Sequence, residues 1–138
     1  MAKLFTFEAH TPYRLFFAGA VEALVVTLLD GEIGVLADHA FFTAPVLTGL
    51  LKIKTKGGVW KTAFTTEGIL EVSGHRTVLM ADAAEWPEEI DRERALAAKK
   101  RAEEQLASQL FHFEADTVRA NLQRAKTRLR AATMRASS

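Results

Sequence analysis

The pattern of apolar and polar positions changes at Trp86-Pro87 and divides the chain into two parts. Before this point, short apolar runs are separated by turn residues at regular spacing, a pattern typical of strands. Gly57-Gly58 lies between two alternating runs and predicts a hairpin, because two-residue primed turns need positive φ. Many short strands with such turns favour an antiparallel sandwich or a flattened barrel. The apolar runs are Leu4–Phe7, Val21–Leu29, Leu50–Lys54, Val59–Phe64, Ile69–Val72 and Thr77–Met80.

After Pro87 the apolar residues recur at helical spacing. Pro87 followed by Glu88, Glu89 and Asp91 predicts a helix start, since proline suits the first turn and acids suit the positive end of the helix dipole. A second helix is expected after Phe111–Phe113, and two apolar stripes joined by a short link predict an antiparallel helical hairpin. We therefore expect a β-sandwich domain over residues 1–86 and a helical hairpin domain over residues 87–138. The stripes are Ala95, Ala98, Ala102 and Leu106, then Ala115, Val118, Leu122, Ala125, Leu129 and Ala132.

The expected seam between the two helices consists mostly of alanine. Burying an alanine methyl contributes about 0.8 kcal/mol, whereas a buried leucine contributes about 1.5–3 kcal/mol. The helices themselves are rich in alanine, arginine, lysine and glutamate, which are good helix formers. Stable helices with a weak contact between them favour an element whose helices can separate without unfolding. The alternative interpretation is a static hairpin.

Composition bounds the class of protein. A chain of 138 residues with 49% apolar residues suits one ordinary domain, or one small domain with an appendage, and excludes wholesale disorder. The absence of cysteine excludes disulfides and thiolate metal sites. No apolar run is long enough to cross a bilayer, and the N-terminus lacks the apolar core of a signal peptide, so we expect a soluble cytosolic chain. The nine phenylalanines and two tryptophans are expected in the core and in sheet packing.

Charge is distributed unevenly, although the net charge is only +1. The segment from Arg119 to Ser138 has six basic residues and no acid, whereas the part before Pro87 has seven basic and nine acidic residues. A basic terminal helix predicts an acidic partner. Binding of nucleic acid through phosphate contacts is the alternative, although the basic positions are spread around the helix. The four histidines lack metal-ligand spacing and no nucleophile elbow or P-loop is present, so an enzyme is not expected.

Several short segments, spread over nearly the whole length, carry a resemblance to a known family. They are Phe17-x-Gly19-x-Val21-Glu22, Gly31–Val35, His39-Ala40, Gly68–Val72, Val78–Glu85, Ile90–Ala95 and Arg101–Glu104. In this order and spacing, they resemble the epsilon subunit of bacterial F-type ATP synthase. The resemblance implies a sandwich of about ten strands followed by two helices.

The resemblance also implies a function for the chain. Members of this family lie in the central rotor stalk, on the cytoplasmic face of the bacterial plasma membrane, and bridge the gamma subunit and the ring of membrane c subunits. They have no catalytic centre, couple proton flow to ATP synthesis mechanically, and inhibit ATP hydrolysis. When the helices extend, the basic second helix meets acidic segments of the catalytic alpha and beta subunits. The residues implied in this contact are Arg124, Lys126, Arg128, Arg130 and Arg135. Helices folded down on the sandwich permit hydrolysis.

ATP is the regulatory ligand that the resemblance implies. Members that sense ATP carry an Ile/Leu-Asp-x-x-Arg-Ala motif, which matches Ile90, Asp91, Arg94 and Ala95; the other matching positions are Glu85, Arg101, Arg124 and Arg128. Several guanidiniums brought together by a folded hairpin repel one another unless a polyanion lies among them. Asp91 or Glu85 can accept hydrogen bonds from the adenine amine or from an arginine. Ordinary solvated salt bridges of these arginines are the alternative.

On the expected sandwich, Glu32 and His39 match positions that contact the c-ring. The surrounding segment departs from the family pattern, which has Pro-Gly before the His-Ala pair and a proline soon after it. Here these positions hold Ala37-Asp38 and Phe41-Phe42. Loss of proline and glycine changes the backbone restrictions of the loop.

Overall fold

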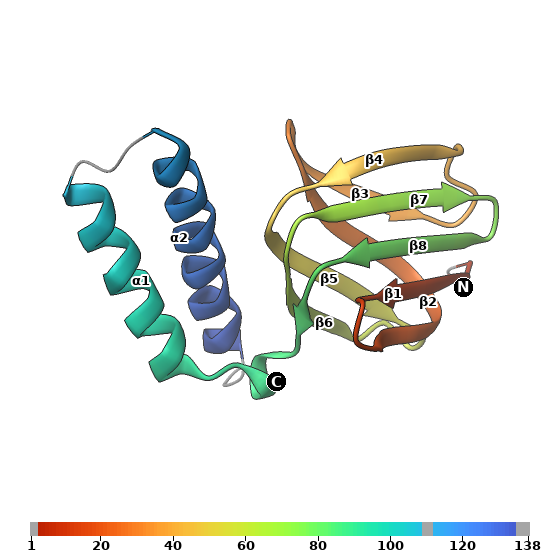
Figure 1. Ribbon diagram of the computed structural model, residues 1–138. Coiled ribbons are helices and arrows are strands. Elements are labelled where there is room, and N and C mark those ends of the chain that lie inside the picture. Colours follow the sequence, from red (N-terminus) through yellow and green to blue (C-terminus); the bar gives the residue numbers. More distant parts are fainter. Residues whose placement is uncertain (1–2, 109–111, 135–138) are drawn as a thin grey trace. The chain divides into compact units, whose positions relative to one another are not determined.

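The computed structural model describes residues 3–108 and 112–134 (Figure 1). The chain divides between Glu85 and Trp86 into two compact units. The first unit contains only strands, and the second contains a short 3-10 turn and two α-helices. This architecture confirms the expected fold class, a β-sandwich followed by a helical hairpin.

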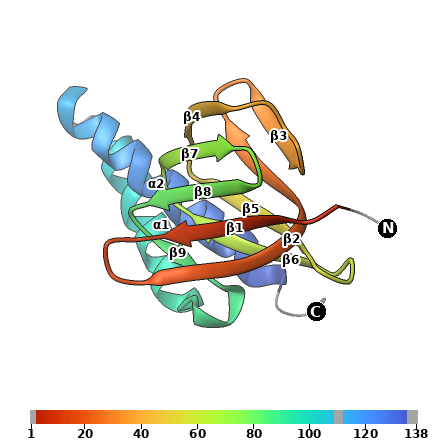
Figure 2. The ribbon, with the colours of Figure 1, turned by 90° about the vertical axis from the view of Figure 1, so that its right-hand side faces the viewer.

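The first unit is a single folded sheet of nine strands among the described residues, where about ten were expected. The order is β4-β7-β8-β1-β2-β5-β6-β9, and β3 pairs with β2 beside this path. Figures 1 and 2 show β4, β7, β8 and β1 in one layer and β5 and β6 in the other. The strands are β1 (Phe5–His10), β2 (Leu15–Leu28), β3 (Gly31–Leu36), β4 (Phe42–Val46), β5 (Gly49–Thr55), β6 (Trp60–Thr65), β7 (Gly68–Ser73), β8 (Arg76–Ala81) and β9 (Ala84–Glu85).

Strand β2 holds the two layers together because it is long enough to take part in both. Its first half pairs with β1, and its second half pairs with β3 and β5. The expected hairpin at Gly57-Gly58 joins β5 and β6, and both glycines have positive φ, of 102° and 85°. These are backbone angles that a primed turn requires.

One strand pair departs from the antiparallel expectation. Strands β1 and β8 run parallel, with Glu8 beside Val78, while the other pairs of the described strands are antiparallel. A parallel pair needs a long connection, and here the intervening strands supply it. Arg76 reinforces this pair, since its Nε and Nη2 donate to Glu8 Oε2 at 3.0 and 2.9 Å. The hydrogen bonds from Arg76 and then His10 lower the pKa of Glu8 below its ordinary value of 4.5.

Apolar side chains alternate along the strands and fill the space between the layers. In β1, Phe5, Phe7 and Ala9 are buried, and the residues between them are not. The expectation that the aromatic residues lie in the core is wrong for Phe41 and Trp60, which are 75% and 50% exposed. The inner face of a strand takes only alternate residues, so a large side chain in a turn or at the other parity stays outside.

The second unit begins differently from the expectation. Pro87–Glu89 is a 3-10 turn (η1), and the first helix, α1 (Arg92–Ala107), begins five residues after the proline. Ile90 and Asp91 have extended backbone angles, and Asp91 Oδ1 accepts a hydrogen bond from Arg94 N at 3.0 Å. Asp91 is therefore the N-cap that sets the start of α1, because its carboxylate binds an amide that the helix leaves unpaired. The second helix is α2 (His112–Thr133), which lies alongside α1 (Figure 1).

Candidate functional site: a basic cavity between two helices

Small side chains form the contact between α1 and α2. Ala95 and Ala102 of α1 are 4% and 2% exposed, and Ala125 of α2 is 2% exposed. Alanine lets two helix backbones approach closely because its side chain ends at the β carbon. At about 0.8 kcal/mol per buried methyl, these three residues together contribute roughly 2–3 kcal/mol to the contact.

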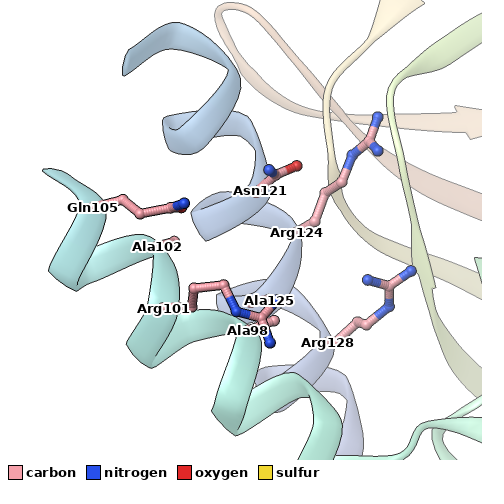
Figure 3. Close-up of a pocket in the computed structure, with 8 residues that line it drawn as sticks. All are labelled: Ala98, Arg101, Ala102, Gln105, Asn121, Arg124, Ala125 and Arg128. Carbon is pink, nitrogen blue, oxygen red and sulfur yellow. The ribbon is translucent and has the colours of Figure 1, made fainter. Parts of the chain in front are cut away.

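A cavity of about 190 Å³ lies along one edge of this seam (Figure 3). We call it the arginine cavity, because one arginine of α1 and two of α2 line it. Figure 3 shows Arg101 reaching from α1 across the seam, whereas Arg124 and Arg128 extend from α2 away from α1. The lining residues are Ala98, Arg101, Ala102 and Gln105 of α1 with Asn121, Arg124, Ala125 and Arg128 of α2.

The lining determines what the arginine cavity can bind. Three arginines and no acid are among the lining residues, and a guanidinium carries forked donors that match phosphate and carboxylate oxygens. The volume is below the roughly 300–1,000 Å³ typical of pockets that enclose a whole small molecule. The cavity therefore suits the phosphate part of a nucleotide better than the entire molecule.

Two amides of the cavity, Gln105 and Asn121, escaped the sequence reasoning. Gln105 lies one turn after Arg101, and Asn121 lies one turn before Arg124. Residues three or four apart share a helix face, so this spacing was the available signal. An amide both donates and accepts hydrogen bonds, and it adds to the cavity a donor that carries no charge.

The motif that first suggested a ligand site lies at the start of α1. Ile90 and Ala95 are buried at 5% and 4% exposure, Asp91 caps the helix, and Arg94 is exposed. None of these residues lines the arginine cavity. Arg94 and Arg101 are seven residues apart, so roughly 10 Å of helix axis separates them. The structure thus gathers Arg101, Arg124 and Arg128 and leaves the motif one to two turns away.

The remaining residue matched to the ATP site belongs to the first unit. Glu85 ends β9 and pairs with Phe64 of β6.

The basic residues matched to a partner contact fall on two sides of α2. Arg124 and Arg128 line the arginine cavity. Lys126 and Arg130 line a separate groove. Arg135 lies outside the described residues.

The residues matched to the c-ring contact lie on the sandwich. Glu32 of β3 is exposed, and one of its carboxylate oxygens lies 3.7 Å from Lys52 Nζ. His39 Nδ1 lies 2.9 Å from the Ala40 carbonyl oxygen, and its ring centre lies 5.0 Å from that of Phe42. Both residues are accessible enough to meet a partner, and neither joins a catalytic arrangement.

The loop before His39 contains a residue other than glycine, Asp38, with a positive φ. Asp38 has φ of 64°, a conformation that glycine adopts freely and that aspartate tolerates better than most residues. Its carboxylate pairs with Lys3 Nζ at 2.6 Å and lies 3.8 Å from His75 Nδ1. The hydrogen bond and charge of Lys3 lower the pKa of Asp38. Asp38 therefore adopts a conformation that favours glycine, and its carboxylate forms two exposed ion pairs.

None of the described helices combines the length and the apolar character needed to cross a membrane. The part of the chain that the structure describes also holds no group of three or more acidic or histidine side chains placed to bind a metal ion.

The fold and the arginine cavity together define a class of protein: a β-sandwich domain followed by a helical hairpin with a basic cavity between its helices. Residues 4–87 match the family model of the ATP synthase delta/epsilon chain β-sandwich domain, and residues 88–133 match that of its long α-helix domain. An ATP synthase epsilon chain from Caldicellulosiruptor saccharolyticus is 49% identical over 126 residues, 91% of each chain. One from Caldanaerobacter subterraneus subsp. tengcongensis is 47% identical over 133 residues, 96% of each. The chain belongs to the family of ATP synthase epsilon chains.

Solved structures show the same fold at low sequence identity. A chain in the mitochondrial ATP synthase of Euglena gracilis, solved with OSCP, F1 and the c-ring, superposes with a TM-score of 0.79 and 18% identity. The superposition covers 98% of this chain and 82% of that one. It shows that the sandwich and the two helices occur together elsewhere.

Proposed function

We propose that the chain is a rotor subunit of an F-type ATP synthase that carries no catalytic centre and couples the gamma subunit to the ring of membrane c subunits. Membership of the epsilon-chain family supports this role. A chain of similar fold belongs to a structure of the Tetrahymena thermophila central stalk and c-ring, with a TM-score of 0.62 and 14% identity. On this proposal Glu32 and His39 face the c-ring. The subunit then lies at the cytoplasmic face of the plasma membrane, attached through its partners, and takes part in proton-driven ATP synthesis.

The second part of the proposal is that the helical hairpin regulates ATP hydrolysis. The observation that carries it is the arginine cavity, whose lining is divided between two helices joined by an alanine seam. Separating α1 from α2 destroys the cavity, so a ligand of the cavity binds only the closed hairpin. A ligand that binds one state shifts the equilibrium toward that state by its differential affinity.

The magnitudes make such a switch workable. The three buried alanines contribute roughly 2–3 kcal/mol to the seam. A ligand at one hundred times its dissociation constant adds about 2.7 kcal/mol to the state that binds it, roughly a hundred-fold change in population. This increment is comparable to the contribution of these three alanines, and it shifts the balance toward the closed hairpin.

ATP is the ligand that we propose for this site. Its triphosphate supplies the negative charge that offsets the repulsion among Arg101, Arg124 and Arg128. Asp91 and Glu85 are the proposed hydrogen-bond acceptors for the adenine amine or for an arginine, and Ile90, Arg94 and Ala95 complete the matched motif. Bound ATP keeps the hairpin folded and permits hydrolysis. Without ATP the helices extend, and the basic face of α2 meets acidic segments of the alpha and beta subunits.

Calorimetric titration of the full chain with ATP tests the site. We expect saturable binding that Arg124→Ala weakens at least about ten-fold, because one charged hydrogen-bonding partner contributes about 1.5–3 kcal/mol. Arg119→Ala is the matched control on the same helix, since Arg119 is exposed and pairs with Asp116 at 3.0 Å. Absence of saturable heat at millimolar ATP would refute the site, and equal losses in both variants would refute its location.

A distance measurement tests the movement. The sequence has no cysteine, so two introduced thiols are the only labelling positions. Ser73→Cys on β7 and Thr117→Cys on α2 replace exposed residues of the two units. We expect the fluorescence distance between the labels to change on addition of ATP, and an unchanged distance at saturating ATP would refute the switch. Co-purification with the alpha, beta and gamma subunits tests the rotor assignment independently.

A further inference from the structure

The two helices form a second groove that the proposed ATP site does not use. It is a shallow groove, largely open to solvent, with a volume of about 430 Å³. One residue comes from α1 and four come from α2, so this groove also depends on the two helices lying together. The lining residues are Lys99, Lys126, Leu129, Arg130 and Thr133.

The second groove and the arginine cavity lie along opposite edges of the seam. Lys99 and Arg101 of α1 are two residues apart, which places them about 200° from each other around the helix. Lys126 and Arg128 of α2 are related in the same way. The two linings share no residue. The basic character of α2 is therefore split between two separate sites.

The chemistry of the second groove differs from that of the arginine cavity. Lys99, Lys126 and Arg130 place three cationic groups on the groove, and none of them has an ion pair within residues 3–108 and 112–134. Leu129 is half-buried and supplies an apolar floor. Lysine stems extend such a floor, because their methylenes cover apolar surface while the ammonium groups stay in water.

An apolar floor with a cationic rim matches a ligand that is both charged and apolar. Inorganic phosphate satisfies the cations and leaves the floor exposed to water. A neutral alkyl chain covers the floor and leaves the cations without partners. We propose that this groove binds an anionic amphiphile, a phosphate or carboxylate head group on a short alkyl chain, with the head on Lys99, Lys126 and Arg130 and the chain on Leu129. Because the lining comes from both helices, this ligand also favours the closed hairpin.

Binding of octyl phosphate to the full chain, kept below its critical micelle concentration, tests the proposal. We expect saturable one-to-one binding, and at least about ten-fold weaker binding of inorganic phosphate, which lacks the alkyl chain. The double variant Lys126→Gln/Arg130→Gln should weaken octyl phosphate binding at least about ten-fold, because two charged contacts are lost. Circular dichroism checks that the variant keeps its helices.

Three controls make the test specific. Arg119→Gln removes a positive charge from the same helix outside the groove and should leave octyl phosphate binding within about two-fold. Leu129→Ser should weaken octyl phosphate binding and leave that of inorganic phosphate unchanged. The double variant should keep its ATP affinity within about two-fold, since the two grooves share no lining residue.

Several outcomes would overturn the proposal. These are absence of saturable binding, equal affinity for inorganic phosphate, and an unchanged affinity in the double variant. Binding to vesicles of phosphatidylglycerol without binding of monomeric octyl phosphate would assign the cations to a membrane surface instead. Failure of ATP to bind would leave this test intact, because the arginine cavity is lined by different residues.

Discussion

Asp91 combines two roles that substitution can separate. In the structure its Oδ1 accepts a hydrogen bond from Arg94 N at 3.0 Å and caps α1. In the proposed function it also accepts a hydrogen bond from the ligand. Asp91→Ala removes both capabilities. Asp91→Ser keeps a capping oxygen, since serine is among the favoured N-cap residues, and removes the carboxylate.

The magnitude of the capping effect follows from the structure. Replacing an N-cap by alanine costs about 1 kcal/mol, within a range of about 0.5–2 kcal/mol. The cap lies within α1, so its loss acts on the first turn of that helix whether the hairpin is closed or open. At about 1.4 kcal/mol per factor of ten, the population of α1 with its first turn formed, relative to frayed, should fall about five-fold.

Thermal unfolding followed by far-ultraviolet circular dichroism, together with ATP titration, distinguishes the roles. We expect Asp91→Ala to lower both the helix stability and the ATP affinity. Asp91→Ser should unfold close to the parent and still bind ATP about ten-fold more weakly, because a hydrogen bond to a charged group is lost. Hydrogen exchange at Arg94 N reports on the cap directly.

Two results would refute this reasoning. An Asp91→Ala protein with parental thermal stability and parental exchange at Arg94 N would show that the cap contributes nothing. An Asp91→Ser protein that binds ATP as tightly as the parent would remove Asp91 from the ligand contacts and leave it as a structural residue.

Three other substitutions test the fold, the seam and the electrostatics. Gly68→Ala places a Cβ against the backbone of β8 and should destabilise the sandwich by about 1–3 kcal/mol in denaturant titration. Gly34→Ala is the control and should be tolerated, because its Cβ would lie 3.8 Å from the nearest atom, the Leu24 carbonyl oxygen. Ala102→Leu overfills the seam and should weaken ATP binding while helix content stays unchanged. Glu8→Gln should lower stability at neutral pH only: the Glu8 pKa is lowered by Arg76, so its contribution is present above pH 4.5 and is lost as the pH falls through the lowered value. A parent and variant that differ equally at all pH values would contradict that assignment.

Only part of the site could be predicted from the sequence, because helical spacing indicates neighbours along one helix and not between two helices. The spacing of Arg124 and Arg128 puts both on one face of α2, and that much is local geometry. Their placement with Arg101 in a single cavity depends on the rotation of α1 against α2, which the packing of Ala102 and Ala125 determines. The same rotation brings Lys99 to Lys126, and no pattern along the chain indicated that pair.

The sequence by itself determined the features that repeat with a local period. Alternating apolar positions indicated strands, apolar positions three and four apart indicated helices, and the change between them at Trp86-Pro87 lies within one residue of the division in the structure. The start of α1 was misplaced because two local signals compete. Proline suits a first turn, yet the extended backbone of Ile90 and the cap at Asp91 move the helix start to Arg92.

Only the tertiary structure decided which distant segments meet. Three features depend on packing between elements. They are the parallel pairing of β1 with β8, the burial of Phe7 beside the exposure of Phe41, and the division of the basic residues of α2 between two grooves. The spacing of apolar residues along the chain determines the type of local element, but the free energy of burying a side chain depends on the residues of the other element that it packs against. That is why the local elements could be predicted from the sequence, while the two cavities that they form between them could not.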